Sequence, residues 1–175
     1  QVDDDLFVIE YNIDSATSCY EARFQPGSPP RFKVTKTLCG PPPLSNGVML
    51  GLEWQVKKDP LRVEYVLSFT KANSPSQLYL YPENSNQPRR LSAERVLGVP
   101  DRYLSEGEDA SYTSFDGLRV SARLYLPSRE LGYTGPRPLV VYVHGGPQGQ
   151  ERPDFTWFSM PLIQYLTLNG LAVFV

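Results

Sequence analysis

The sequence has few of the residues that build metal or disulfide sites. Among 175 residues it contains two cysteines, Cys19 and Cys39, and one histidine, His144. Neither cysteine belongs to a C-x-x-C pair, so a zinc set of cysteine and histidine ligands cannot be assembled. Two cysteines also cannot define a disulfide framework. We expect two free thiols in half-buried strands, and the alternative is a bridge between neighbouring strands in an oxidising compartment.

Excess positive charge and long apolar runs are lacking as well. The net charge is −2, which argues against nucleic acid or an anionic membrane surface as a partner. The longest apolar runs are far too short to span a bilayer. The first residues, Gln1–Asp5, are acidic, contain no initiator methionine and show no signal segment. We therefore expect an internal piece of a longer chain, with no nucleic-acid or membrane partner.

Residues 1–93 are predicted to be short strands separated by turns. The candidate strands are rich in β-branched and aromatic residues. They are Leu6–Tyr11, Ser18–Phe24, Arg31–Leu38, Val48–Val56, Arg62–Phe69 and Gln77–Tyr81. Clusters of proline, glycine, asparagine and serine separate them. This spacing, without helical periodicity, indicates a sandwich, a barrel or propeller blades, and periodicity alone does not choose among the three.

Residues 94–108 are charged and punctuated, which predicts a linker, and residues 109–175 change to an α/β pattern. Asp116-Gly117 between two alternating runs predicts a hairpin. Its second strand is expected to bury one face and solvate the other. The buried face would carry Leu118, Val120, Ala122, Leu124 and Leu126, and the solvated face Arg119, Ser121, Arg123 and Tyr125. A short helix capped by Ser159 and a strand after Asn169-Gly170 complete a predicted βαβ unit.

An apolar strand that runs into a glycine turn is the candidate functional element. The strand, Leu139–Val143, is predicted to be buried on both faces of a mostly parallel sheet. The turn His144-Gly145-Gly146-Pro147 follows it directly. Glycines allow a close backbone approach and outward N–H groups. Because α/β proteins bind ligands at the carboxyl ends of their strands, we place the candidate site at this turn.

Several motifs, in order, resemble the prolyl oligopeptidase family of serine peptidases. They are Tyr112–Leu118 (YTSFDGL), Arg123–Pro127 (RLYLP), Pro138–Gly149 (PLVVYVHGGPQG) and Asn169–Val175 (NGLAVFV). Residues 68–92 are similar to the last propeller blade of that family. The His-Gly-Gly-Pro form looks like its acylaminoacyl-peptidase and oligopeptidase branch. The resemblance is strong over residues 62–175, whereas residues 1–61 share only the strand-rich character.

This resemblance implies a β-rich part, a partial β-propeller over residues 1–93, followed by the start of an α/β-hydrolase sheet over residues 109–175. It also implies a serine peptidase that hydrolyses short peptides by a Ser-Asp-His mechanism, without a cofactor or a metal. The sequence does not decide whether the protein forms a homo-oligomer. The alternatives are an α/β-hydrolase esterase, or a non-catalytic module in which a degenerate hydrolase binds peptide or a partner.

The resemblance also assigns roles at the turn. The backbone N–H of Gly146 would be the loop half of the oxyanion hole, and Gly145 would shape the loop. His144 and Pro147 would line the site. His144 is not expected to be the general base, because in this fold the base follows the nucleophile and the acid along the chain. Phe155, Trp157 and Phe158 are candidates for lining the substrate pocket, with core packing or a domain contact as the alternative.

The nucleophile, the acid and the base are expected beyond Val175, because no serine here has glycine at both −2 and +2. We predict that purified residues 1–175 do not hydrolyse a peptide anilide. The release of the chromophore measures this, with the full-length protein as the control. Turnover by residues 1–175 alone would contradict the prediction.

Overall fold

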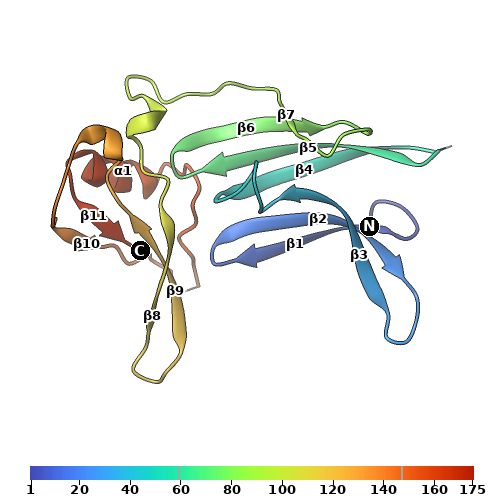
Figure 1. Ribbon diagram of the computed structural model, residues 1–175, viewed down its shortest axis with the longest axis horizontal. Coiled ribbons are helices and arrows are strands. Elements are labelled where there is room, and N and C mark those ends of the chain that lie inside the picture. The colour runs from blue at the N-terminus through green and yellow to red at the C-terminus, as the bar shows by residue number, and fades with distance from the viewer. Residues whose placement is uncertain (59, 147) are drawn as a thin grey trace. The chain divides into compact units, whose positions relative to one another are not determined.

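The computed structural model describes residues 1–58, 60–146 and 148–175, which form two compact units (Figure 1). The first unit comprises Gln1–Phe69 and Ser76–Ala93. The second comprises Thr70–Pro75 and Glu94–Val175. The structure is rich in strands, in three sheets, so the β-rich class expected from the sequence is confirmed.

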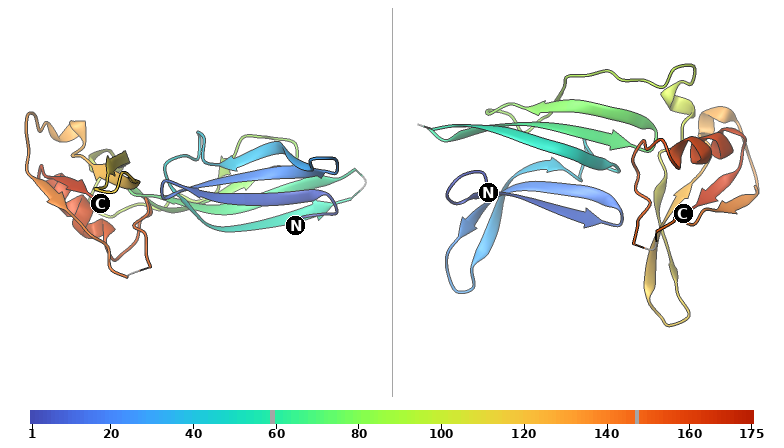
Figure 2. Two further views of the ribbon diagram at one scale, coloured as in Figure 1. Left: turned by 90° about the horizontal axis from the view of Figure 1, so that it is seen from below. Right: turned by 180° about the vertical axis from the view of Figure 1, so that it is seen from behind.

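Two sheets form the first unit, with strand orders β1-β2-β3 and β4-β5-β6-β7. Their strands are β1 (Leu6–Ile13), β2 (Ala16–Gln25), β3 (Arg31–Cys39), β4 (Val48–Lys57), β5 (Arg62–Lys71), β6 (Ser74–Tyr81) and β7 (Arg89–Arg90). The six predicted strands coincide with β1 to β6, each within a few residues. The pair of stacked sheets, visible from two further sides in Figure 2, is consistent with part of a β-propeller.

An apolar core joins the two sheets of this unit. Leu6 and Leu38 from one sheet pack in the same cluster as Leu67 from the other. Two tyrosines reach across with their hydroxyls. Tyr65 Oη donates to Glu21 Oε2 at 2.6 Å, and Tyr81 Oη donates to the Leu38 carbonyl at 2.7 Å. A buried hydroxyl without a partner would be destabilising, so these two bonds let the rings lie in the core.

The second unit contains one sheet of order β10-β11-β9-β8 and one α-helix. The elements are η1 (Asp101–Tyr103), β8 (Glu108–Thr113), β9 (Arg119–Tyr125), η2 (Arg129–Leu131), β10 (Leu139–Val141), α1 (Met160–Leu168) and β11 (Ala172–Phe174). β8 pairs with β9 antiparallel, and β10 pairs with β11 in parallel. The predicted hairpin at Asp116-Gly117 and the βαβ unit are therefore confirmed. Gly117 has a φ of 86°, the left-handed conformation that its turn requires.

The buried face predicted for β9 is wrong. Arg123 is 2% exposed and Tyr125 is fully buried, whereas Leu118 is 65% exposed. Helix α1 covers the Tyr125 face, where the ring packs with Ile163. Arg123 is tolerated on this face because its guanidinium pairs with the carboxylate of Asp109 at 2.7 Å, directly across the hairpin. The position of the helix, rather than the apolar side of the strand, decides which face is covered.

The burial predicted for Leu139–Val143 on both faces is also wrong. β10 lies at the edge of its sheet with β11 as its neighbour. Leu139 and Val141 are 56% and 63% exposed. Successive side chains of a strand point to opposite faces, and α1 covers the face that carries Tyr142. The apolar side chains on the opposite face therefore stay exposed.

One buried amide fastens helix α1 within the second unit. Gln164 Nε2 donates to the carbonyls of Ala72 and Ser105, each at 2.9 Å. Gln164 Oε1 accepts from the Ser105 N–H at 2.8 Å.

The helix has nine residues, and within the described ranges no helix is long and apolar enough to cross a membrane.

We predict that Gln164→Leu lowers the free energy of unfolding by about 1–3 kcal/mol, because three buried backbone groups lose their partner. Urea unfolding of the purified protein measures the loss. Gln87→Leu, at an exposed position, is the matched control and should change the free energy little. Equal effects of the two substitutions would show that the amide contacts of Gln164 do not stabilise the unit.

Candidate functional site

The glycine turn lies at the carboxyl end of β10. The Tyr142 N–H donates to the Phe174 carbonyl at 2.8 Å, which continues the pairing with β11 up to the turn. His144, Gly145 and Gly146 then follow as exposed residues. Pro147 lies outside the described residues. Because β10 and β11 are parallel, their carboxyl ends share one edge of the sheet, which is where sites of α/β proteins are found.

The two glycines differ in the space around them. A Cβ atom added to Gly146 would lie 2.8 Å from the Gln148 nitrogen and 3.2 Å from the Gly149 nitrogen. A Cβ atom added to Gly145 would meet nothing within 4 Å. The backbone nitrogens of Gln148 and Gly149 therefore lie too close to Gly146 to admit a side chain at that position. Gly145 is under no such steric constraint from the described residues.

His144 faces its own turn. Its Nδ1 lies 2.9 Å from the carbonyl oxygen of Gly145, so Nδ1 donates this bond when it carries the proton. The ring is exposed. It also lies close enough to Glu151 for its charge to influence that carboxyl.

Two half-buried carboxylates lie beyond the turn, and the sequence did not single out either. Burial raises the pKa of Glu151. A hydrogen bond from the Ser159 hydroxyl lowers that pKa, repulsion from Asp154 raises it and attraction to His144 lowers it. Burial is also the main cause of the raised pKa of Asp154. Ser159 occupies the N-cap position of α1 as predicted, but its side chain makes no capping bond, because the buried hydroxyl donates to Glu151.

The three aromatic candidates separate into two groups. Phe155 packs partly buried against the core of the second unit, and its N–H donates to Thr70 Oγ1 at 3.0 Å. Trp157 and Phe158 are largely exposed, with their rings edge to face at a centroid distance of 5.6 Å. Phe155 therefore has a packing contact, and the other two rings form an exposed pair.

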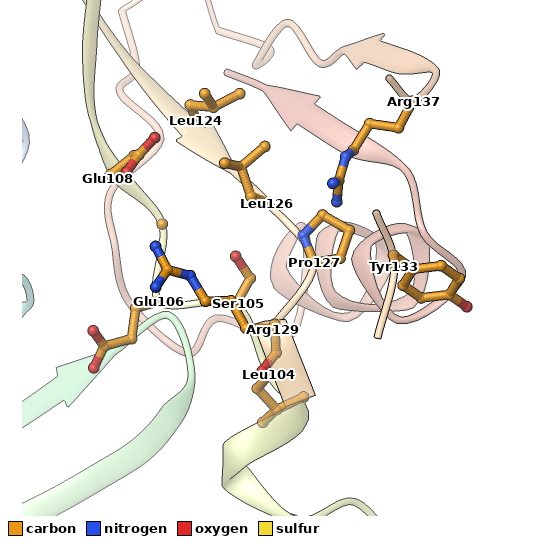
Figure 3. A pocket seen from close by; sticks show the side chains of 12 residues that line it. Leu104, Ser105, Glu106, Glu108, Leu124, Leu126, Pro127, Arg129, Tyr133 and Arg137 are labelled. Carbon is orange, nitrogen blue, oxygen red and sulfur yellow. The ribbon is translucent and has the colours of Figure 1, made fainter. Parts of the chain in front are cut away.

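A cavity of about 540 Å³ lies beside the end of β9. Figure 3 shows Leu124, Leu126 and Pro127 beside it, with charged side chains around them. It is lined by Leu104, Ser105, Glu106, Gly107, Glu108, Leu124, Leu126, Pro127, Ser128, Arg129, Tyr133 and Arg137. His144, the one histidine of the sequence, is not in this lining, so the cavity offers no serine–histidine pair. Across the described ranges, no group of three or more acidic, cysteine or histidine side chains could hold a metal.

No model of a known protein family matches the sequence, and no curated protein matches it. Solved structures do match. One comes from a structural and mechanistic study of two prolyl endopeptidases, with a TM-score of 0.63 and 19% identity, over 100% of this chain and 23% of that chain. Oligopeptidase B from Leishmania major gives a TM-score of 0.60 and 11% identity, over 99% and 23%. Oligopeptidase B from Trypanosoma brucei, with covalently bound antipain, gives 0.56 and 16%, over 98% and 25%.

The chain spans about a quarter of the length of these proteins. Over that span it has the fold of the corresponding segment in prolyl endopeptidases and oligopeptidase B, so the resemblance noted in the sequence is confirmed at the level of the fold.

We predict that Glu151→Gln increases stability at neutral pH. Glutamine can still accept the Ser159 hydrogen bond but has no charge to desolvate. The pKa of Glu151 is raised in the folded state. The protonated carboxyl therefore stabilises the folded protein below the unfolded pKa, about 4.3. This stabilisation is lost as the pH rises through the folded pKa.

Urea unfolding at a series of pH values measures this difference. The advantage of the variant should disappear as the pH falls below about 4. Glu130→Gln, at an exposed position, should show no comparable trend. A variant less stable than the parent at pH 7 would contradict the prediction.

Proposed function

We propose that the chain is an internal segment of a serine peptidase of the prolyl oligopeptidase family, which hydrolyses short peptides. Residues 1–93 would form the C-terminal part of a β-propeller, residues 94–108 a linker and residues 109–175 the first part of an α/β-hydrolase domain. The observation that carries the proposal is the likeness of fold along the whole chain to prolyl endopeptidases and oligopeptidase B.

The sheet of the second unit supports this proposal because both of its faces are apolar. Helix α1 packs on one face, whereas Leu139, Val141 and Phe174 alternate onto the other, where Tyr112 lies against the Phe174 ring. Sheets with parallel strands are normally covered on both faces, as in α/β folds. The exposed face therefore suits a second layer of helices from the remainder of a hydrolase domain.

The turn after β10 supports the loop half of an oxyanion hole. When a serine attacks a peptide carbonyl, negative charge develops on the oxygen, and fixed N–H donors stabilise it. In α/β-hydrolases one donor is the N–H after the nucleophile and the other comes from the glycine loop. We assign the loop donor to the Gly146 N–H, because the tight backbone that excludes a side chain there also fixes the direction of this group.

The other residues near the turn take secondary roles in the proposal. His144 lines the site, and Pro147, which lies outside the described residues, is assigned the same role from the sequence alone. The base that accepts the serine proton lies beyond Val175, with the acid and the nucleophile. Trp157 and Phe158 are the aromatic rings available to a substrate or to another part of the protein. Phe155 contributes through its packing in the core.

We predict that Gly146→Ala in the full-length protein lowers kcat by roughly 10²–10³-fold, the usual effect of losing one oxyanion donor. The added Cβ must displace the Gln148 backbone and so misdirects the Gly146 N–H. Gly145→Ala is the matched control, since its Cβ meets open space, and should change kcat little. Peptide-anilide hydrolysis gives kcat, and thermal melting shows whether each variant folds.

Two outcomes would overturn the proposal in different ways. Equal kcat values for the two folded variants would remove the oxyanion role of Gly146. A folded full-length protein that neither hydrolyses peptides nor is labelled by a fluorophosphonate would show that it has no reactive serine, which favours the non-catalytic binding module.

A further inference from the structure

Cys19 and Cys39 lie directly opposite each other on β2 and β3. The pairing is antiparallel, and the register shifts after Cys19, so that Tyr20 pairs with Thr37 and Leu38 has no opposite residue of its own. Residues directly opposite each other share one face of a sheet. Both side chains lie in the core of the first unit, at 0% and 1% exposure.

This position meets the geometric requirement for a disulfide. Opposite residues of antiparallel strands have Cα atoms about 4.5 or 5.5 Å apart, and disulfides join Cα atoms about 4.4–6.8 Å apart. Both thiols are free in this structure. The Cys39 thiol donates a weak hydrogen bond to the Thr17 carbonyl at 3.7 Å, and oxidation would remove this bond.

We propose that Cys19 and Cys39 are a site of reversible cross-strand disulfide formation, with a small disulfide such as glutathione disulfide as the oxidant. One thiolate attacks the small disulfide, forms a mixed disulfide and releases one small thiol. The second cysteine then attacks the protein sulfur of the mixed disulfide and releases the other small thiol. Two protein thiols are oxidised, one small disulfide is reduced to two thiols, and the thiol protons pass to the thiols released.

The surroundings restrict when this reaction occurs. Burial raises the pKa of both thiols to about 12, so the folded protein holds very little of the thiolate that attacks disulfides. Burial also keeps a small disulfide away from both sulfurs. The bond therefore forms while β2 and β3 are still open, during folding in an oxidising medium, and the folded core then protects it from reductants.

The experiment refolds the full-length protein from urea with glutathione disulfide, and in parallel with dithiothreitol. Free thiols are then alkylated and the protein is digested with trypsin. The expected product of oxidation is the tryptic peptide that ends at Arg23 and carries Cys19, linked to peptide 37–57, because trypsin cleaves after Arg23, Lys36 and Lys57. The oxidised protein should melt at a higher temperature, since a cross-link restricts the unfolded chain. Adding dithiothreitol should reverse that shift only after unfolding.

Two variants control for proximity in the unfolded chain. Cys39→Ala leaves Cys19 without its opposite cysteine and should give a glutathione adduct on Cys19. Cys39→Ala with Thr37→Cys moves the second thiol opposite Tyr20, onto the other face of the sheet, and should give no linked peptide. Glutathione adducts on both native cysteines without a linked peptide, or equal linkage in the double variant, would overturn the proposal. Neither result depends on peptidase activity.

Discussion

The packing of helix α1 on its sheet decides the geometry of the second unit. The helix places Ile163 against the Tyr125 ring and Val173, and Gln164 joins it to the Ala72 and Ser105 backbones. Burying these groups stabilises the unit more than covering the apolar side chains of β9 would. Those apolar side chains lie on the opposite face of the strand. The same contact holds the βαβ unit together and so fixes the edge at which the turn of Gly146 emerges.

Two features surround the turn: close backbone packing at Gly146 and two half-buried carboxylates beyond it. The backbone nitrogens of Gln148 and Gly149 lie too close to Gly146 to admit a Cβ there. Beyond the turn, Glu151 and Asp154 are held where burial disfavours their charge. Because burial disfavours their charged forms, these two carboxylates lower the stability of the folded unit at neutral pH.

Local signals were sufficient for most of the secondary structure, and long-range contacts account for the errors. β-branched and aromatic runs between proline and glycine clusters predicted β1 to β6, and Asp116-Gly117 predicted the hairpin, because these preferences act within a few residues. The covered face of β9 depends on a helix about forty residues later. The Ser159 hydroxyl prefers Glu151, which no capping rule considers. The glycine turn could be located from sequence, whereas the two carboxylates and the pairing of Cys19 with Cys39 required the register and the packing.

The position of β11 has a consequence for the order of events during synthesis. β11 lies between β9 and β10, although it is the last of these strands along the chain. The β8–β9 hairpin can pair as soon as it leaves the ribosome. Among the described strands, β10 has β11 as its neighbour, so its backbone N–H and C=O groups stay unpaired in this sheet until residues 172–174 emerge. A nascent chain that pauses before β11 therefore presents an unpaired strand edge, which is the form most prone to pair with another chain or to engage a chaperone.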